Sequence, residues 1–183
     1  MAITKLQAEA LNLADTYAFT GTVTGAGQNN APYFHARTNA DHSVGYTGNY
    51  TKIQLNTDIL DSASAFDTSN YRFTPQTAGK YFVIGQIYFE TTSSSNNYNN
   101  LITLGTTIQK NGSIIAHNYV FRGGQEFGIR KRTLRTSVII DMNGSSDYLE
   151  LFAYSDSHKA GDCNAASDAG GGATFLAGHF LTT

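Results

Sequence analysis

The sequence predicts an all-β protein with many tight turns. More than a third of the 183 residues are Thr, Asn, Ser or Gly, of which Thr suits strands and the other three suit turns. The chain also contains 11 Tyr, 11 Phe and only two Pro. From Pro32 onward, apolar residues alternate with period two over short segments separated by turn residues. This pattern is typical of a sandwich, a jelly roll or a barrel.

The first 30 residues differ from the rest and are predicted to form a separate segment. Apolar residues recur first at helical and then at strand spacing, at Ile3, Leu6, Leu13, Tyr17 and Phe19. A helix of about 12 residues is marginal alone in water, so this segment needs a surface to lie on. Residues 25–30 are predicted to be a linker. Two interpretations stay open, a loose extension and a docking segment that orders on a partner.

Residues 31–183 are predicted to form one head domain of eight to ten short strands. We expect strands at residues 33–37, 52–55, 69–74, 80–90, 101–110, 113–116, 136–142, 148–154 and 173–181. Asn111 and Gly112 lie between two alternating runs, which predicts a hairpin with a type I′ turn. Residues 143–147 are predicted to form the longer loop of a second hairpin.

The segment 80–90 is the strongest predicted strand. Phe82, Ile84 and Tyr88 alternate with a second apolar set that contains Tyr81 and Val83. A strand that is apolar on both faces is expected to be central and covered on both sides. One face of a sandwich sheet is usually wet in a monomer, so this strand predicts a subunit interface.

Composition and charge exclude several classes of protein. Charged residues make up 14% of the chain and the net charge is -2, which argues against a protein that binds nucleic acid by bulk electrostatics. A single Cys excludes an intrachain disulfide framework and a multi-Cys zinc site. The sequence has no apolar run of 18 residues, so we expect no membrane span. A surface of hydroxyls and amides is more typical of extracellular and virion proteins than of cytosolic enzymes.

Three segments carry a resemblance to a known family. The most specific runs from Tyr71 through Phe73, Thr74 and Gly79 to Tyr81-Phe82, and the Lys-Asn-Gly turn and the terminal segment 175–181 support it. Over residues 33–181 the chain resembles the globular head of complement component 1q, the tumour-necrosis-factor-like jelly roll. The resemblance implies a ten-stranded jelly roll that forms homotrimers. The implied trimer-interface residues are Phe82, Ile84, Tyr88 and Phe180.

The N-terminal segment carries a second resemblance. Residues 3–15, followed by 17–27, resemble the leader of short structural proteins of tailed bacteriophages, including cyanobacterial phages. This resemblance implies that residues 1–30 fasten the head to another virion protein of the capsid, neck or tail. The anchoring residues would be Ile3, Leu6, Leu13, Tyr17 and Phe19, and the protein would lie at the virion surface.

The search for catalytic motifs predicts that the protein is not an enzyme and has no catalytic residues. None of the five His lies in a His-x3-His pattern, and there is no Gly-x-Ser-x-Gly elbow. Asp58 and Asp61 lie in a turn-like stretch, where we expect them to cap local backbone. His179 is interpreted as a satisfied interface histidine rather than an ion ligand.

Three features remain as candidate binding sites, and each has a plainer alternative as a solvated loop or connection. Asp156, Asp162 and Asp168 could ligate calcium, which takes oxygen ligands, although their spacing does not fit an EF-hand. Tyr98 and Asn99 are the candidate ligand loop, because a Tyr ring stacks on a pyranose and an amide bonds its hydroxyls. Basic residues gather within 122–135 and could meet an anionic glycan or an acidic capsid surface. The remaining residue of interest, Cys163, is interpreted as a small filler.

Together these observations favour a non-enzymatic component of a bacteriophage virion. The first hypothesis is a homotrimeric surface fibre or knob, attached through residues 1–30, that contacts host surface polysaccharide. The alternatives are a capsid decoration protein that stabilises the shell and a free lectin-like binding module. Sequence does not separate a fibre from a decoration protein, whereas the number of copies per particle does.

Overall fold

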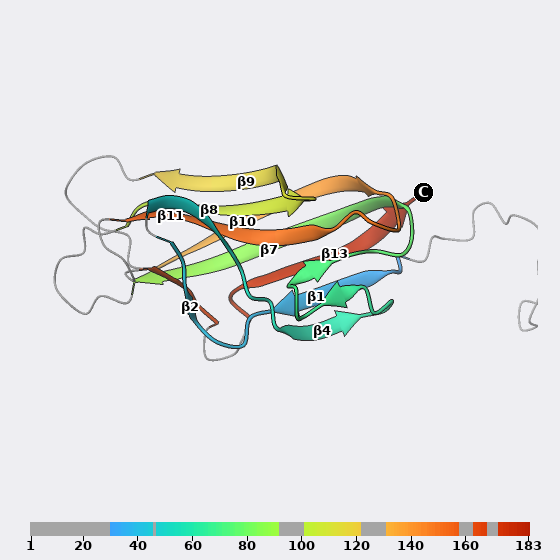
Figure 1. The fold of residues 1–183 in the computed structure, drawn as a ribbon, viewed down its shortest axis with the longest axis horizontal. Coiled ribbons are helices and arrows are strands. Elements are labelled where there is room, and N and C mark those ends of the chain that lie inside the picture. Colours follow the sequence, from blue (N-terminus) through green and yellow to red (C-terminus); the bar gives the residue numbers. More distant parts are fainter. Residues whose placement is uncertain (1–29, 46, 92–100, 122–130, 158–162, 168–171) are drawn as a thin grey trace, which may run out of the picture.

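The structure is a computed structural model that describes residues 30–45, 47–91, 101–121, 131–157, 163–167 and 172–183. These residues form thirteen strands and no helix, which confirms the all-β prediction within the described ranges. The strands make two sheets that face each other (Figure 1). No helix in the described part of the chain is long and apolar enough to cross a lipid bilayer.

The first sheet is built around the long strand β7 (Gly79–Thr91). Its other strands are β1 (Tyr33–Arg37), β2 (His42–Ser43), β4 (Thr57–Asp61), β10 (Lys131–Met142), β12 (Cys163–Ala165) and β13 (Phe175–Thr182). Strand β10 pairs with β7 along twelve consecutive residues, from Lys131 beside Glu90 to Met142 beside Gly79. Strands β12 and β13 also pair with β7, and β1 lies between β13 and β4. All these pairs are antiparallel.

The second sheet contains six strands. They are β3 (Thr47–Lys52), β5 (Phe66–Asp67), β6 (Arg72–Phe73), β8 (Leu101–Lys110), β9 (Ser113–Phe121) and β11 (Leu149–Ser157). Strand β11 is central, because it pairs with β8 over its whole length and with β3 and β6 at different points. Strand β9 follows β8 in a hairpin and forms one edge. Strands β3 and β11 therefore lie side by side, although they are far apart in the sequence.

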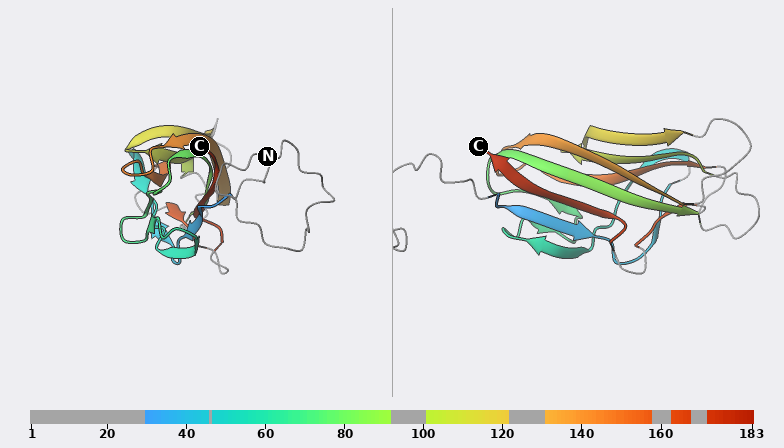
Figure 2. Two further views of the ribbon diagram at one scale, coloured as in Figure 1. Left: turned by 90° about the vertical axis from the view of Figure 1, so that its right-hand side faces the viewer. Right: turned by 180° about the vertical axis from the view of Figure 1, so that it is seen from behind.

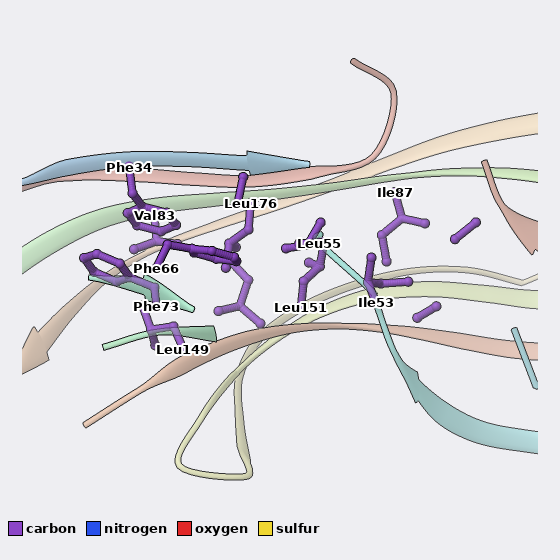
Figure 3. Close-up of a cluster of buried hydrophobic side chains, with 14 of the residues drawn as sticks. Phe34, Ile53, Leu55, Phe66, Phe73, Val83, Ile87, Leu149, Leu151 and Leu176 are labelled. Carbon is purple, nitrogen blue, oxygen red and sulfur yellow. The ribbon is translucent and has the colours of Figure 1, made fainter. Parts of the chain in front are cut away.

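The hydrophobic core lies between the two sheets (Figure 3). A row of aromatic rings within it connects strands of both sheets. Phe34 of β1 stacks on Phe73 of β6, with ring centroids 3.8 Å apart. Phe73 meets the ring of Tyr81 at 5.7 Å, and Tyr81 meets Phe180 at 5.5 Å. The buried Tyr81 hydroxyl donates a hydrogen bond of 2.9 Å to the carbonyl oxygen of Thr77, so burial leaves it paired. These rings tie β6 of the second sheet to three strands of the first.

The two predicted turns are confirmed by the backbone geometry. Asn111 has a φ of 51° and Gly112 a φ of 79°, and the type I′ turn requires positive φ at both positions. In the second hairpin, the Asn143 side-chain oxygen accepts hydrogen bonds from the N–H groups of Ser145, Ser146 and Asp147. The amide and hydroxyl side chains of this loop therefore organise the local backbone, as expected of turn residues.

Some elements differ from the sequence-based expectation. The stretch that contains Asp58 was expected to be a turn, but residues 57–61 form the edge strand β4 beside β1. An edge strand needs no alternating pattern, and Leu60 of β4 is exposed. The capping role of Asp61 is nevertheless confirmed, because its carboxylate accepts the N–H of Phe66 at 2.7 Å. The expected strand 52–55 is also displaced: β3 ends at Lys52 and the following residues enter the core.

The structure places part of the basic segment 122–135 on a strand. Strand β10 begins at Lys131, so the basic residues from that point lie on a strand rather than in a connection. Lys131 pairs with Glu90 at 2.7 Å on the neighbouring strand, which offsets part of the local positive charge. Residues 122–130 lie outside the described ranges, and an anionic partner for this segment stays a prediction.

The aromatic row predicts a large loss of stability when its central ring is removed. Phe73→Ala deletes a fully buried ring that contacts both sheets, so we expect the free energy of unfolding to fall by about 3–5 kcal/mol. The control Phe121→Ala removes a ring that is 71% exposed and should cost less than about 1 kcal/mol. Urea unfolding at one protein concentration measures both. Equal losses in the two variants would contradict this account of the core.

Candidate functional sites on the two sheets

The first sheet carries an apolar outer face, opposite the core. The strand register places Ile139 of β10 beside Phe82 of β7, and Phe82 beside His179 of β13. The next row places Ile84 of β7 beside Ala177 of β13. The right-hand view of Figure 2 shows β10, β7, β13 and β1 side by side in front of the other layer. We call this surface the apolar sheet face.

Two exposed side chains show that the described part of the chain leaves this face open. Ile139 is 60% exposed and Tyr33, at the other end of the same row, is 45% exposed. Ile84 and Tyr88 are half-buried on β7, and the ammonium group of Lys131 lies 5.9 Å from the centre of the Tyr88 ring. The apolar face therefore presents aromatic and aliphatic side chains that a further molecule could cover.

One predicted interface residue lies elsewhere. Phe180 is 8% exposed and packs against Tyr81 in the core. Successive residues of a strand point to opposite faces, so its neighbour His179 lies on the apolar sheet face instead. The His179 ring lies 5.8 Å from the ring of Phe82. We therefore replace Phe180 by His179 in the set of candidate interface residues and keep Phe82, Ile84 and Tyr88.

A polar pair crosses the apolar sheet face. The Arg135 guanidinium donates to the Gln86 side-chain oxygen from Nε at 3.0 Å and from Nη2 at 2.5 Å. The Gln86 amide nitrogen in turn donates to the carbonyl oxygen of Ala173 at 2.9 Å. Gln86 is nearly buried, and these bonds use both its acceptor and a donor. A partner that covers the face would therefore meet a fixed cation at this row.

His35 lies on the same face, on β1 beside Ala177. Its ring meets the ring of Phe175 edge-on at 5.2 Å. Burial, and secondly the positive charge of Arg37, lower the pKa of His35, while the carboxylate of Asp58 acts in the opposite direction. The neutral ring is therefore the form that the folded chain favours at this position.

The second sheet carries a different surface, built from tyrosines. The register aligns Tyr50 of β3, Tyr154 of β11, Gly105 of β8 and Tyr119 of β9 in one row. The Tyr50 and Tyr154 ring centroids are 5.3 Å apart, and those of Tyr154 and Tyr119 are 5.4 Å apart. The hydroxyl oxygens of Tyr50 and Tyr119 are hydrogen-bonded at 2.6 Å. With Thr103, these three tyrosines line an open hollow of about 300 Å³, which we call the tyrosine hollow.

Gly105 makes room for this arrangement. A Cβ atom at this position would lie 2.1 Å from two carbons of the Tyr119 ring, which is far inside contact distance. The ring can lie across the strand because residue 105 has no side chain. Sequence reasoning missed this site, since its three tyrosines come from three separate segments. The Gly within the alternating run 101–110 was the available signal, because such a residue often marks a close approach to the strand.

Most other predicted site residues lie outside the described ranges. These are Ile3, Leu6, Leu13, Tyr17, Phe19, Tyr98, Asn99, Asp162 and Asp168. Asp156 is described and lies on β11 beside Thr103 and Thr47. The described residues contain no group of three His, Cys, Asp or Glu side chains that could hold a metal ion, so calcium binding stays a prediction. The expectation for Cys163 is confirmed, because its side chain is fully buried in the core.

Comparison with known proteins identifies the fold. No protein-family model and no curated protein matches the sequence. Among solved structures, the chain is similar to the Eiger TNF of S. frugiperda, at 11% identity and a TM-score of 0.56, over 82% of this chain and 90% of that chain. It is also similar to murine APRIL, at 10% identity and a TM-score of 0.56, over 81% and 98%. At this identity the likeness shows the fold alone, and the chain has the tumour-necrosis-factor-like jelly roll that the sequence predicted.

The globular domain of zebrafish complement 1qA protein also matches, at 11% identity and a TM-score of 0.49, over 82% of this chain and 97% of that chain. The resemblance of residues 3–27 to phage leaders concerns a segment outside the described ranges and stays a prediction.

The lowered pKa of His35 predicts a pH dependence of stability. As the pH falls through the usual His value near 6.5, the unfolded chain takes up the proton before the folded chain does. The folded state should therefore be most stable above this pH and lose stability between about pH 7 and pH 5. Urea midpoints measured across this range should show the loss, and His35→Gln should reduce it. An unchanged slope in the variant would contradict the assignment.

Proposed function

We propose that the chain is a homotrimeric surface protein of a bacteriophage virion, a fibre or knob without enzymatic activity. The observation that supports self-association is the apolar sheet face, on which Ile139 and Tyr33 remain exposed at the two ends of one row. Phe82 and His179 lie between them, and Ile84 lies in the next row. Burying apolar area stabilises an association by roughly 25 cal/mol per Å². A second copy of the chain offers the same apolar surface to cover.

The jelly roll supports a trimer as the oligomeric state, in addition to the apolar sheet face. The resemblance to the tumour-necrosis-factor-like family implies compact homotrimers, and the solved structures similar to this chain have the same fold. The fixed Arg135–Gln86 pair suits a closed assembly, because a defined polar contact within an apolar interface favours one register over others.

The virion role is supported by the N-terminal segment and by composition. Residues 1–30 resemble phage leaders, and only 14% of the chain is charged. Residue 30 enters the jelly roll beside the end of β13, where the N–H of Phe180 donates to the carbonyl oxygen of Pro32 at 2.8 Å. An anchor at this end would direct the opposite end of the strands away from the particle. Contact with host surface polysaccharide and calcium binding at Asp156, Asp162 and Asp168 are part of this proposal.

Self-association through the apolar sheet face is tested by a charge placed on it. Light scattering of the full chain should give a mass of three times 19.8 kDa. Ile139→Glu should shift the protein to monomer, because the carboxylate would be desolvated in the interface. Ile114→Glu is the matched control, since Ile114 is 42% exposed on β9 of the other sheet. A concentration-independent monomer of the parent chain would reject the trimer, and a trimeric Ile139→Glu protein would place the interface elsewhere.

The virion role is tested by the copy number of the chain in purified particles. We expect gel quantification against the major capsid protein to find a few trimers per particle, as for a fibre. Hundreds of copies would instead support the decoration protein, and absence from the particle would leave the free binding module.

Deleting residues 1–30 should leave a folded trimer that no longer joins the particle. If the truncated chain aggregates, the two-part organisation is wrong.

A further inference from the structure

We propose that the tyrosine hollow on the second sheet binds a neutral pyranose residue of a polysaccharide. This inference rests on the surface role proposed above and gives the glycan contact a place in the described part of the molecule. The hollow lies on the layer opposite the apolar sheet face, so self-association through that face and binding in the hollow use different sheets (Figure 1).

The rings of the hollow provide a surface for the apolar side of a sugar. Tyr50 is 41% exposed and Tyr119 and Tyr154 are half-buried, so the rings are held by packing but reach solvent. The Tyr119 ring stands nearly perpendicular to the Tyr154 ring, at 84°, and therefore forms a wall beside it. A pyranose presents C–H groups on one face, and these pack against an aromatic ring as apolar surface does. A volume of about 300 Å³ is at the lower end of ligand pockets and suits a short saccharide unit.

The hydroxyl groups of the hollow provide the polar half of the site. Tyr50 and Tyr119 share one hydrogen bond of 2.6 Å, in which one phenol donates and the other accepts. The accepting phenol keeps its own hydrogen, which can be donated to a ligand, and both oxygens keep lone pairs. Thr103 adds a third hydroxyl to the lining. Hydroxyls that both donate and accept match the hydroxyl groups around a pyranose.

The charge of the lining favours a neutral ligand. The hollow is lined by three tyrosines and a threonine, none of which is charged at neutral pH. Burial, and secondly the hydrogen bond that Tyr119 shares with Tyr50, raise the pKa of Tyr119, so its phenol stays protonated in mildly alkaline solution as well. A neutral saccharide needs no counter-charge here, whereas a sulfated or carboxylated ligand would find none.

The hollow depends on a residue that strands usually avoid. Glycine inside a strand is less stable than alanine, because it loses more conformational entropy on folding. At residue 105 a Cβ atom would overlap the Tyr119 ring, so the glycine positions that ring across β8 and beside Tyr154.

The position of the hollow also suits a surface contact. Its residues lie in the half of β11 and β8 that is away from the entry of residue 30, since Leu149 and Lys110 mark the near end.

The expected affinity of one hollow for a saccharide is low, and three hollows on one trimer should bind a polysaccharide more tightly. A neutral hydrogen bond to a ligand replaces one to water and its net contribution is small, so a single site should bind weakly. Three hollows on one homotrimer would raise the apparent affinity for a repeating polysaccharide by about 10²–10⁴ when the ligand spans them. A polysaccharide is therefore a better probe than a free monosaccharide.

The test uses the purified full chain and immobilised mannan, dextran and galactan, with chondroitin sulfate as an anionic comparison. The variant Tyr50→Phe/Tyr119→Phe removes both hydroxyls and keeps the rings, and Gly105→Ala displaces the Tyr119 ring. Tyr148→Phe is the matched control, because Tyr148 directly precedes β11, at the end away from the hollow, where the Arg72 guanidinium lies 4.8 Å from the centre of its ring. Circular dichroism and light scattering check that each variant keeps the fold and the oligomeric state of the parent.

We expect the parent and Tyr148→Phe to bind at least one neutral polysaccharide, and both hollow variants to bind it about tenfold more weakly or worse. Equal binding by folded hollow variants would overturn the site but leave the glycan contact of the virion protein elsewhere. Binding of none of the neutral polysaccharides by the parent would also overturn it. If the parent is retained on a choline-substituted matrix and binds no neutral polysaccharide, the saccharide site is overturned. The hollow would then be a site for quaternary ammonium groups, because aromatic rings attract such cations. The copy number in particles tests the virion role separately.

Discussion

The pairing of β7 with strands on both of its edges is the contact on which the rest of the structure depends. Strand β10 follows one edge of β7 for twelve residues, while β12 and β13 share the other edge. Because the pairing fixes the register, it decides which side chains of four strands point to the core and which point away. A shift of β7 by one residue would place Phe82 and Ile84 in the core and expose Tyr81 and Val83. The core and the apolar sheet face are therefore specified together.

The two outer surfaces of the sandwich differ in chemistry and therefore suit different kinds of partner. On the first sheet, aliphatic and aromatic side chains lie beside the Arg135–Gln86 pair, and ion pairs at Lys80–Asp141 and Lys131–Glu90 lie toward the two ends of β7. An apolar centre with polar ends suits a large partner surface of similar chemistry. On the second sheet, phenol hydroxyls hydrogen-bond to each other at the edge of their rings, which suits a small ligand with many hydroxyls. The hydrophobic core lies between the two surfaces, so a side chain can change on either surface without contacting the other.

Sequence patterns predicted the elements that carry a strong local signal. The alternation in residues 33–37, 80–90 and 101–110 gave strands that the structure confirms, and the Asn111–Gly112 turn has the expected positive φ values. Strand β4 was missed because an exposed edge strand has no alternating pattern, and the three residues of β12 are too few to show a period. Phe180 was placed on the wrong side of a correctly predicted strand, since a period of two does not say which set faces inward. The tyrosine hollow was missed because only the register across four strands brings its residues together.

The order of strands along the chain also determines when the apolar sheet face can form during translation. The middle of that face is supplied by β13, whose residues 175–182 are the last to be synthesised of those that form it. During translation, β7 and β10 can pair while the edge of β7 that β13 will occupy is still vacant. A nascent chain on the ribosome therefore lacks the complete apolar sheet face until β13 has emerged and paired with β7, whereas the pairing of β7 with β10 needs no residue beyond Met142.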